Sequence, residues 1–157
     1  MNYTSYDIKG KTEAEISKTL DNHDIIHMEG GNTFYILKTI QETNFETILR
    51  EKLNNGLNYI GTSAGSYVVT PSIITATWND RGFDRCGLED FAGMNFVPFV
   101  LKAHYTNERK ETILNNTKDL RWPLRILNDY QAFAVNNQEV KFIGKGEEIT
   151  LDQLQNE

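Results

Sequence analysis

The chain has 157 residues and a mass of 18.0 kDa, so we expect one domain over residues 1–157. Its 16 Lys and Arg against 22 Asp and Glu give a net charge of −6, which disfavours a nucleic-acid partner. The apolar runs are too short to cross a bilayer and the first residues contain no signal core, so we expect a cytoplasmic protein. A single cysteine, Cys86, cannot form an internal disulfide, and one cysteine with three histidines disfavours a structural zinc site. We expect no metal and no cofactor.

The first part of the chain alternates amphipathic helices with short apolar strands. The periodicity, the helix caps and the glycine turns set the expected boundaries. In chain order we expect a helix over 12–21, a strand over 24–29, helices over 32–43 and 45–54, a strand over 57–61 and a helix over 64–69.

The second part begins with an irregular polar segment and ends in closely spaced strands. We expect loop over 71–90, a strand over 99–104, a helix over 107–117, a strand over 124–127, and an antiparallel meander of strands over 131–135, 139–143 and 148–151. This order predicts an α/β fold with a mostly parallel, doubly wound sheet and a short antiparallel C-terminal meander.

The most specific motif is a serine between a strand and a helix. Gly61-x-Ser63-x-Gly65 has the spacing of a nucleophile elbow, in which the serine lies on a sharp turn between small residues. The N–H of Ala64 would begin the following helix without an intrahelical acceptor, and it could therefore stabilise an oxyanion. A glycine-rich turn without chemistry is the alternative, but the strand before it and the helix after it favour the elbow.

A second glycine turn, at Gly30 and Gly31, also follows an expected strand. The carboxyl ends of parallel strands are where open α/β sheets bind ligands, so either glycine could supply a second oxyanion N–H. Neither turn has the pattern of a phosphate-binding loop. Asn32 would cap the next helix or contact a substrate.

A nucleophilic serine needs a base and a carboxylate. His104 ends an expected strand and opens a polar loop, whereas His27 lies inside a strand and is better explained as a sheet residue. Two carboxylates could orient the imidazole, Asp80 in the polar segment and Asp129 after the strand over 124–127. Aspartate in loops is also a common turn residue.

Three separated segments, IIHMEGGNTFYILK, YIGTSAGSYVVTPSI and NFVPFVLKAHYTNE, resemble the peptidase E family of serine peptidases, the aspartyl dipeptidases. The resemblance covers about residues 5–145. It implies a sheet like that of flavodoxin and the class I glutamine amidotransferases, with Ser63 as nucleophile and His104 as base. The relay acid falls on Asp80, with Asp129 as the alternative, and the glycine turn falls on Gly30 and Gly31.

The resemblance also implies a substrate, a dipeptide or short peptide with an N-terminal aspartate. An acidic substrate needs a cation, and Arg109 resembles an arginine near the family's substrate site, with Arg81 and Arg85 as alternatives. Two departures stand out: Ala103 precedes the histidine where proline is usual, and the chain begins near the third strand-helix unit. A binding or oligomeric remnant without activity is therefore a second hypothesis, and an esterase or amidase with the same elbow is a third.

The same departure leads to a prediction about association. If the first two strands of a flavodoxin-like order are missing, the strand over 24–29 becomes a sheet edge. This strand is apolar until Glu29, and an unprotected apolar edge favours pairing with another chain. We therefore expect a homodimer or higher oligomer whose contact includes residues 1–30.

Overall fold

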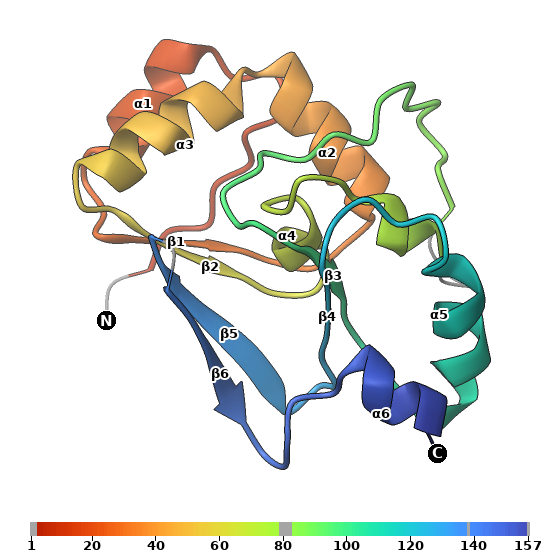
Figure 1. The fold of residues 1–157 in the computed structure, drawn as a ribbon. Helices are drawn as coiled ribbons and strands as arrows, with labels where there is room; N and C mark the ends of the chain where they lie inside the picture. Colours follow the sequence, from red (N-terminus) through yellow and green to blue (C-terminus); the bar gives the residue numbers. More distant parts are fainter. Residues whose placement is uncertain (1–2, 79–82, 138, 157) are drawn as a thin grey trace.

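The structure is a computed structural model that describes residues 3–78, 83–137 and 139–156 (Figure 1). The helices are α1 (Glu13–Leu20), α2 (Thr33–Glu42), α3 (Phe45–Asn54), α4 (Ala64–Tyr67), η1 (Ile74–Trp78), η2 (Asn107–Arg109), α5 (Lys110–Asn116) and α6 (Leu151–Asn156), of which η1 and η2 are 3₁₀ helices. The strands are β1 (Ile25–Met28), β2 (Asn58–Gly61), β3 (Val100–Lys102), β4 (Leu124–Ile126), β5 (Gln131–Asn136) and β6 (Glu139–Gly144).

The described strands form three two-stranded sheets. β1 pairs in parallel with β2, β3 pairs in parallel with β4, and β5 and β6 form an antiparallel hairpin. The prediction of an α/β fold with parallel pairing followed by an antiparallel C-terminal unit is therefore confirmed. Each parallel pair is joined through helices, as parallel connections require.

The end of the chain differs from the prediction. Residues 148–151 do not add a third strand to the meander: Ile149 makes a single antiparallel bridge to Ile126, and α6 begins at Leu151. The reason is a reciprocal cap in which the N–H of Gln153 donates to Thr150 Oγ1 at 3.3 Å and the N–H of Thr150 donates to Gln153 Oε1 at 3.0 Å. This pair is a capping box, which starts a helix rather than a strand.

Helices α1, α2 and α3 lie together above β1 and β2 in Figure 1 and enclose most of the core. A capping box between Thr12 and Glu15 starts α1, and the Asn32 side chain caps α2. The buried residues of this cluster on these three helices are Ile16, Leu20, Phe34, Leu37, Ile40, Phe45, Ile48 and Leu49.

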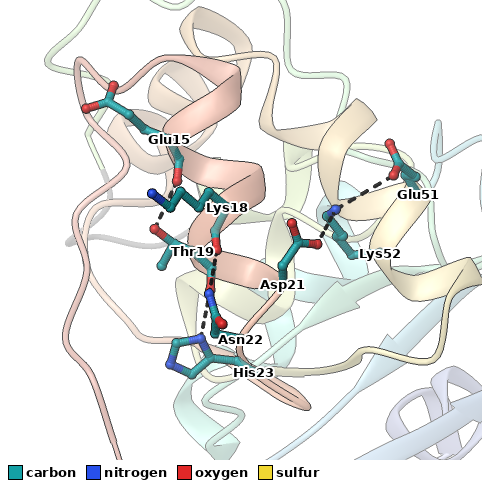
Figure 2. A network of polar contacts seen from close by, with 8 residues as sticks. All are labelled: Glu15, Lys18, Thr19, Asp21, Asn22, His23, Glu51 and Lys52. Carbon is teal, nitrogen blue, oxygen red and sulfur yellow. Dashed lines mark hydrogen bonds and ion pairs between the residues drawn. The ribbon is translucent and has the colours of Figure 1, made fainter.

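A polar network joins the end of α1 to the end of α3 (Figure 2). Lys52 Nζ lies 2.6 Å from Asp21 Oδ1 and 3.7 Å from Glu51 Oε1, and Asp21 raises the pKa of Lys52. On the α1 side, the ring of His23 lies 2.8 Å from the carbonyl oxygen of Thr19. The pair of Lys52 and Asp21 therefore joins the two helix ends.

Among the described residues, the two faces of the sheet of β1 and β2 differ in their cover. Ile26, Met28 and Tyr59 pack against the core, whereas Ile25 and Ile60 are exposed on the other face. A second, smaller cluster joins Ile113 of α5, Ile126 of β4 and Leu154 of α6 at the other end of the molecule. Among the residues that the structure describes, no helix is long and apolar enough to cross a membrane.

Candidate active site

Ser63 lies on a sharp turn between β2 and α4, as the motif predicts. Its backbone has φ 51° and ψ −114°, a conformation that is unfavourable for a residue with a side chain. The flanking glycines allow this turn to fold back closely. A Cβ on Gly61 would lie 2.6 Å from the carbonyl oxygen of Gly65, and a Cβ on Gly65 would lie 2.1 Å from the carbonyl oxygen of Met28.

Two further hydrogen bonds stabilise the turn. The Ser66 hydroxyl donates to the carbonyl of Gly61 at 2.8 Å, and the Tyr59 hydroxyl donates to the carbonyl of Gly65 at 2.7 Å. Burial raises the pKa of Tyr59, so this hydroxyl stays protonated and remains a donor. The strain at Ser63 is therefore held in place by the chain on both sides of it.

His104 reaches Ser63 from the end of β3. Its Nε2 atom lies 3.0 Å from Ser63 Oγ, which is hydrogen-bond distance. The residue has φ 60°, so the chain turns sharply where it leaves the strand. The next residue is fixed by a hydrogen bond from the N–H of Tyr105 to the carbonyl of Leu127 at 3.0 Å.

Asp129 approaches the other ring nitrogen. Its Oδ1 atom lies 2.5 Å from His104 Nδ1, so serine, imidazole and carboxylate form a continuous chain. The parallel pairing of β3 with β4 brings the two loops together, because both follow the carboxyl ends of neighbouring strands. The side chains of His104 and Asp129 are 44% and 69% exposed, so this chain of groups is open to a solute.

Two of the predicted oxyanion residues, Gly30 and Ala64, lie beside the serine. A Cβ on Gly30 would lie 3.2 Å from Ser63 Cβ, which means that the backbone of the second glycine turn touches the turn that carries Ser63. Ala64 is buried at the first position of α4, where its N–H has no intrahelical acceptor. Gly31 follows Gly30 directly, and both precede the cap of α2.

The remaining predicted residues are spread around this turn. The Asn32 side chain accepts from the N–H of Tyr35 at 3.0 Å and donates to the carbonyl of Phe83 at 3.1 Å, so it caps α2 and ties a loop to it. Arg109 ends η2 and is half-buried. Asp80 and Arg81 lie outside the described residues, so the predictions on these two residues stay predictions.

The structure also brings to this turn residues that the sequence analysis did not include among the candidate site residues. His27 Nε2 lies 3.1 Å from Thr62 Oγ1, directly before Ser63. Tyr67 is buried one helical turn after Ser63, and its hydroxyl oxygen accepts from the N–H of Ala103 at 3.0 Å. The i, i+4 spacing of Ser63 and Tyr67 was visible in the sequence, but the contact with Ala103 was not.

This arrangement has the order of groups that serine hydrolases use. A hydroxyl contacts an imidazole, the imidazole contacts a carboxylate, and the backbone of Gly30 lies next to the serine. The contact from hydroxyl to imidazole to carboxylate fits acyl transfer. Within the described residues, no group of three or more His, Cys, Asp or Glu side chains could hold a metal ion.

A match to a family model shows to which protein family the chain belongs. The model of peptidase family S51 matches residues 1–143. The chain belongs to this family. The S51 match includes both glycine turns, Ser63, His104 and Asp129, so the family extends over the whole candidate site.

Individual relatives agree with the S51 assignment. An uncharacterized peptidase of Pasteurella multocida is 32% identical over 136 residues, which are 84% of this chain and 65% of that protein. A peptidase E of Nostoc sp. is 35% identical over 134 residues, which are 84% of this chain and 50% of that protein. The chain thus spans about half to two thirds of the length of these relatives.

A solved structure supports the fold. The crystal structure of a protein assigned to peptidase E from Listeria monocytogenes EGD-e matches with a TM-score of 0.77 over 90% of this chain and 69% of that chain, at 23% identity. The described elements therefore form a fold of the peptidase E type, as the resemblance predicted.

Proposed function

We propose that the chain is a serine peptidase that hydrolyses dipeptides or short peptides with an N-terminal aspartate. The observation that carries the proposal is the continuous contact from Ser63 Oγ through His104 to Asp129, at 3.0 and 2.5 Å. Membership of family S51 and the peptidase E relatives support the reaction class. The aspartate preference rests on the resemblance to the aspartyl dipeptidases.

In the proposed reaction Ser63 Oγ attacks the carbonyl carbon of the N-terminal residue. His104 Nε2 accepts the hydroxyl proton and returns it to the leaving amine, so that an acyl-enzyme and the free C-terminal product form. Water then attacks the acyl-enzyme, again with His104 as base, and releases the amino acid. The N–H groups of Ala64 and of Gly30 or Gly31 are the proposed oxyanion donors.

We propose Asp129 as the carboxylate that orients the imidazole. Its contact with Nδ1 would hold the proton on that nitrogen and leave Nε2 free to act as the base. The resemblance gives this role to Asp80, and a comparison of Asp80→Asn with Asp129→Asn decides between the two carboxylates.

The aspartate side chain of a substrate needs a positive partner, because a net charge of −6 repels it at long range. Arg109 is the described candidate, since η2 begins three residues after His104. Arg85 is exposed in the loop that Asn32 binds, and it is the alternative. Arg109→Gln should raise KM for an aspartyl dipeptide far more than for a neutral dipeptide.

The direct test is hydrolysis of Asp-Leu by the purified chain, followed by detection of free leucine. Leu-Asp and Ala-Leu test the substrate preference, p-nitrophenyl acetate tests an esterase, and Ser63→Ala is the control in every assay. We expect the wild type to release leucine from Asp-Leu and Ser63→Ala to release none. Cleavage of Ala-Leu at the same rate would contradict the aspartate preference, and activity of Ser63→Ala at the wild-type level would contradict the nucleophile.

We also propose that the chain forms a homodimer through β1 and the exposed face beside it. In the described sheet β1 has a partner strand on one side only, and Ile25 and Ile60 are 39% and 47% exposed. Parallel strands normally have both faces covered, so this face favours a second copy.

Sedimentation at micromolar concentration tests the dimer. Ile25→Lys should shift the chain to monomer, whereas Ile143→Lys, an equally exposed isoleucine on β6, should not. A wild-type chain that is a stable monomer would contradict the association.

A further inference from the structure

Tyr67 connects the element that carries the nucleophile to the element that carries the base. It lies at the end of α4, and its N–H donates to the carbonyl of Ser63 at 3.3 Å. Its side chain is 2% exposed, so the ring is fixed by packing. Any displacement of this ring would therefore be transmitted to the turn that holds Ser63.

The other end of the Tyr67 side chain holds the residue before His104. The N–H of Ala103 donates to Tyr67 Oη at 3.0 Å. The ladder between β3 and β4 ends at the pair Lys102–Ile126, so Ala103 is the first residue after the strand. A buried N–H without an acceptor is costly, and Tyr67 supplies the acceptor at the point where the chain turns.

The turn after Ala103 requires this support. His104 has φ 60°, which a side chain disfavours, so its backbone conformation must be imposed by its neighbours. On the far side, the bond from Tyr105 to Leu127 fixes the chain, and on the near side the bond from Ala103 to Tyr67 does so. Hydrogen bonds thus fix the backbone on both sides of His104. One of them comes from Tyr67 of α4, the helix that follows Ser63.

We propose that Tyr67 is a positioning residue that sets the separation between Ser63 Oγ and His104 Nε2. The phenol ring is a rigid spacer between α4 and the end of β3, and it acts on the reaction only through these two residues. The proposal rests on the proposed function, because it gives Ser63 and His104 the roles of nucleophile and base. A misplacement of about 1 Å can cost about 100-fold in rate, so a spacer at this position should affect turnover.

The first test is Tyr67→Phe, with Thr43→Val as the matched control. Both variants remove a buried hydroxyl that contacts backbone, but the bonds of Thr43 stay at the end of α2 and reach neither Ser63 nor His104. For Asp-Leu we expect Tyr67→Phe to lower kcat about 10- to 100-fold with KM changed less than about threefold. A kcat within twofold of the wild type, or an equal loss in Thr43→Val, would overturn the proposal.

The second test uses the partner of the hydroxyl. In Ala103→Pro the proline Cδ would take the place of the N–H and clash with Tyr67 Oη, so this variant should also lose turnover. In the double variant Tyr67→Phe with Ala103→Pro, the missing hydroxyl makes room for Cδ and no buried N–H is left without an acceptor. We expect the double variant to recover at least tenfold in kcat over Ala103→Pro, whereas additive losses would overturn the proposal.

Two readouts separate this proposal from the substrate assignment. The rate at which a fluorophosphonate probe labels Ser63 measures the activated serine without a peptide, and it should fall in Tyr67→Phe in parallel with kcat. A crystal structure of Tyr67→Phe should have Ser63 Oγ and His104 Nε2 beyond hydrogen-bond distance. If the wild type is inert toward both Asp-Leu and the probe, the proposed function fails, and an unchanged Oγ–Nε2 distance in the variant would overturn the role of Tyr67 independently.

Discussion

His104 Nε2 lies 3.0 Å from Ser63 Oγ although 41 positions separate the two residues, and both have a positive φ. The values are 60° for His104 and 51° for Ser63. Two adjacent side chains of the candidate site therefore lie on backbone that is strained for any residue other than glycine. Such strain is typical of functional sites, and the fold must offset it elsewhere.

Replacement of Ser63 should reveal this strain. Ser63→Gly and Ser63→Ala both remove the hydroxyl, but only glycine relieves the backbone at φ 51° and ψ −114°. Glycine also raises the entropy of the unfolded chain, which lowers stability. With this cost included, the free energy of unfolding of Ser63→Gly should exceed that of Ser63→Ala by about 1 kcal/mol. Urea denaturation of the two variants measures the difference, and a less stable Ser63→Gly would contradict a strained turn.

The two carboxylates should differ in their effect on turnover. If Asp129 orients His104, Asp129→Asn should lower kcat at least about 100-fold, because the amide favours the wrong imidazole tautomer. Asp80→Asn should then have a mild effect on Asp-Leu hydrolysis. The reverse ranking would move the relay to Asp80, and large losses in both variants would call for the double variant as a test of non-additivity.

Gly65 should be intolerant of even a methyl group. A Cβ there would lie 2.1 Å from the carbonyl oxygen of Met28, and this oxygen accepts the N–H of Thr62 at 3.1 Å. Because backbone must move, Gly65→Ala should lower the free energy of unfolding by about 3 kcal/mol or more. Gly87→Ala is the control, since its φ is 63° but nothing lies near its Cβ, and it should cost about 1 kcal/mol. Equal losses would contradict the steric account.

Asp84 should make the stability of the fold depend on pH. Its carboxylate accepts the N–H of Cys86 at 2.9 Å and the N–H of Leu88 at 2.7 Å, and the bond from Cys86 above all lowers the pKa of Asp84. At a pH above the unfolded-state pKa of about 3.9, the lowered pKa of Asp84 stabilises the fold. This contribution is lost as the pH falls through the pKa of Asp84 in the folded state.

Urea denaturation of Asp84→Asn at pH 7 and at about pH 2.5 tests this dependence. The wild type should be more stable than the variant at pH 7, and the gap should shrink at the lower pH. A gap of the same size at both values would contradict the role of the charged carboxylate.

Much of the fold was predictable from local pattern. Helix α3 has the predicted bounds, 45–54, because its apolar residues recur at helical spacing and a glycine follows its end. At the end of the chain, the alternation of Ile149 and Leu151 favours a strand over 148–151, whereas the structure has a helix from Leu151. The spacing of Thr150 and Gln153 is the capping-box signal for that helix.

Ser63 could be proposed from sequence alone because its signal is local: the strand, the turn and the helix of the elbow occupy consecutive residues. The choice between Asp80 and Asp129 could not be made in that way. The contact of Asp129 with His104 depends on the parallel pairing of β3 with β4, which brings together the ends of strands that are distant in sequence. The same holds for Tyr67 and Ala103, which are 36 positions apart. Local spacing determines which residues share a turn or a helix face, whereas strand pairing and packing determine which turns meet.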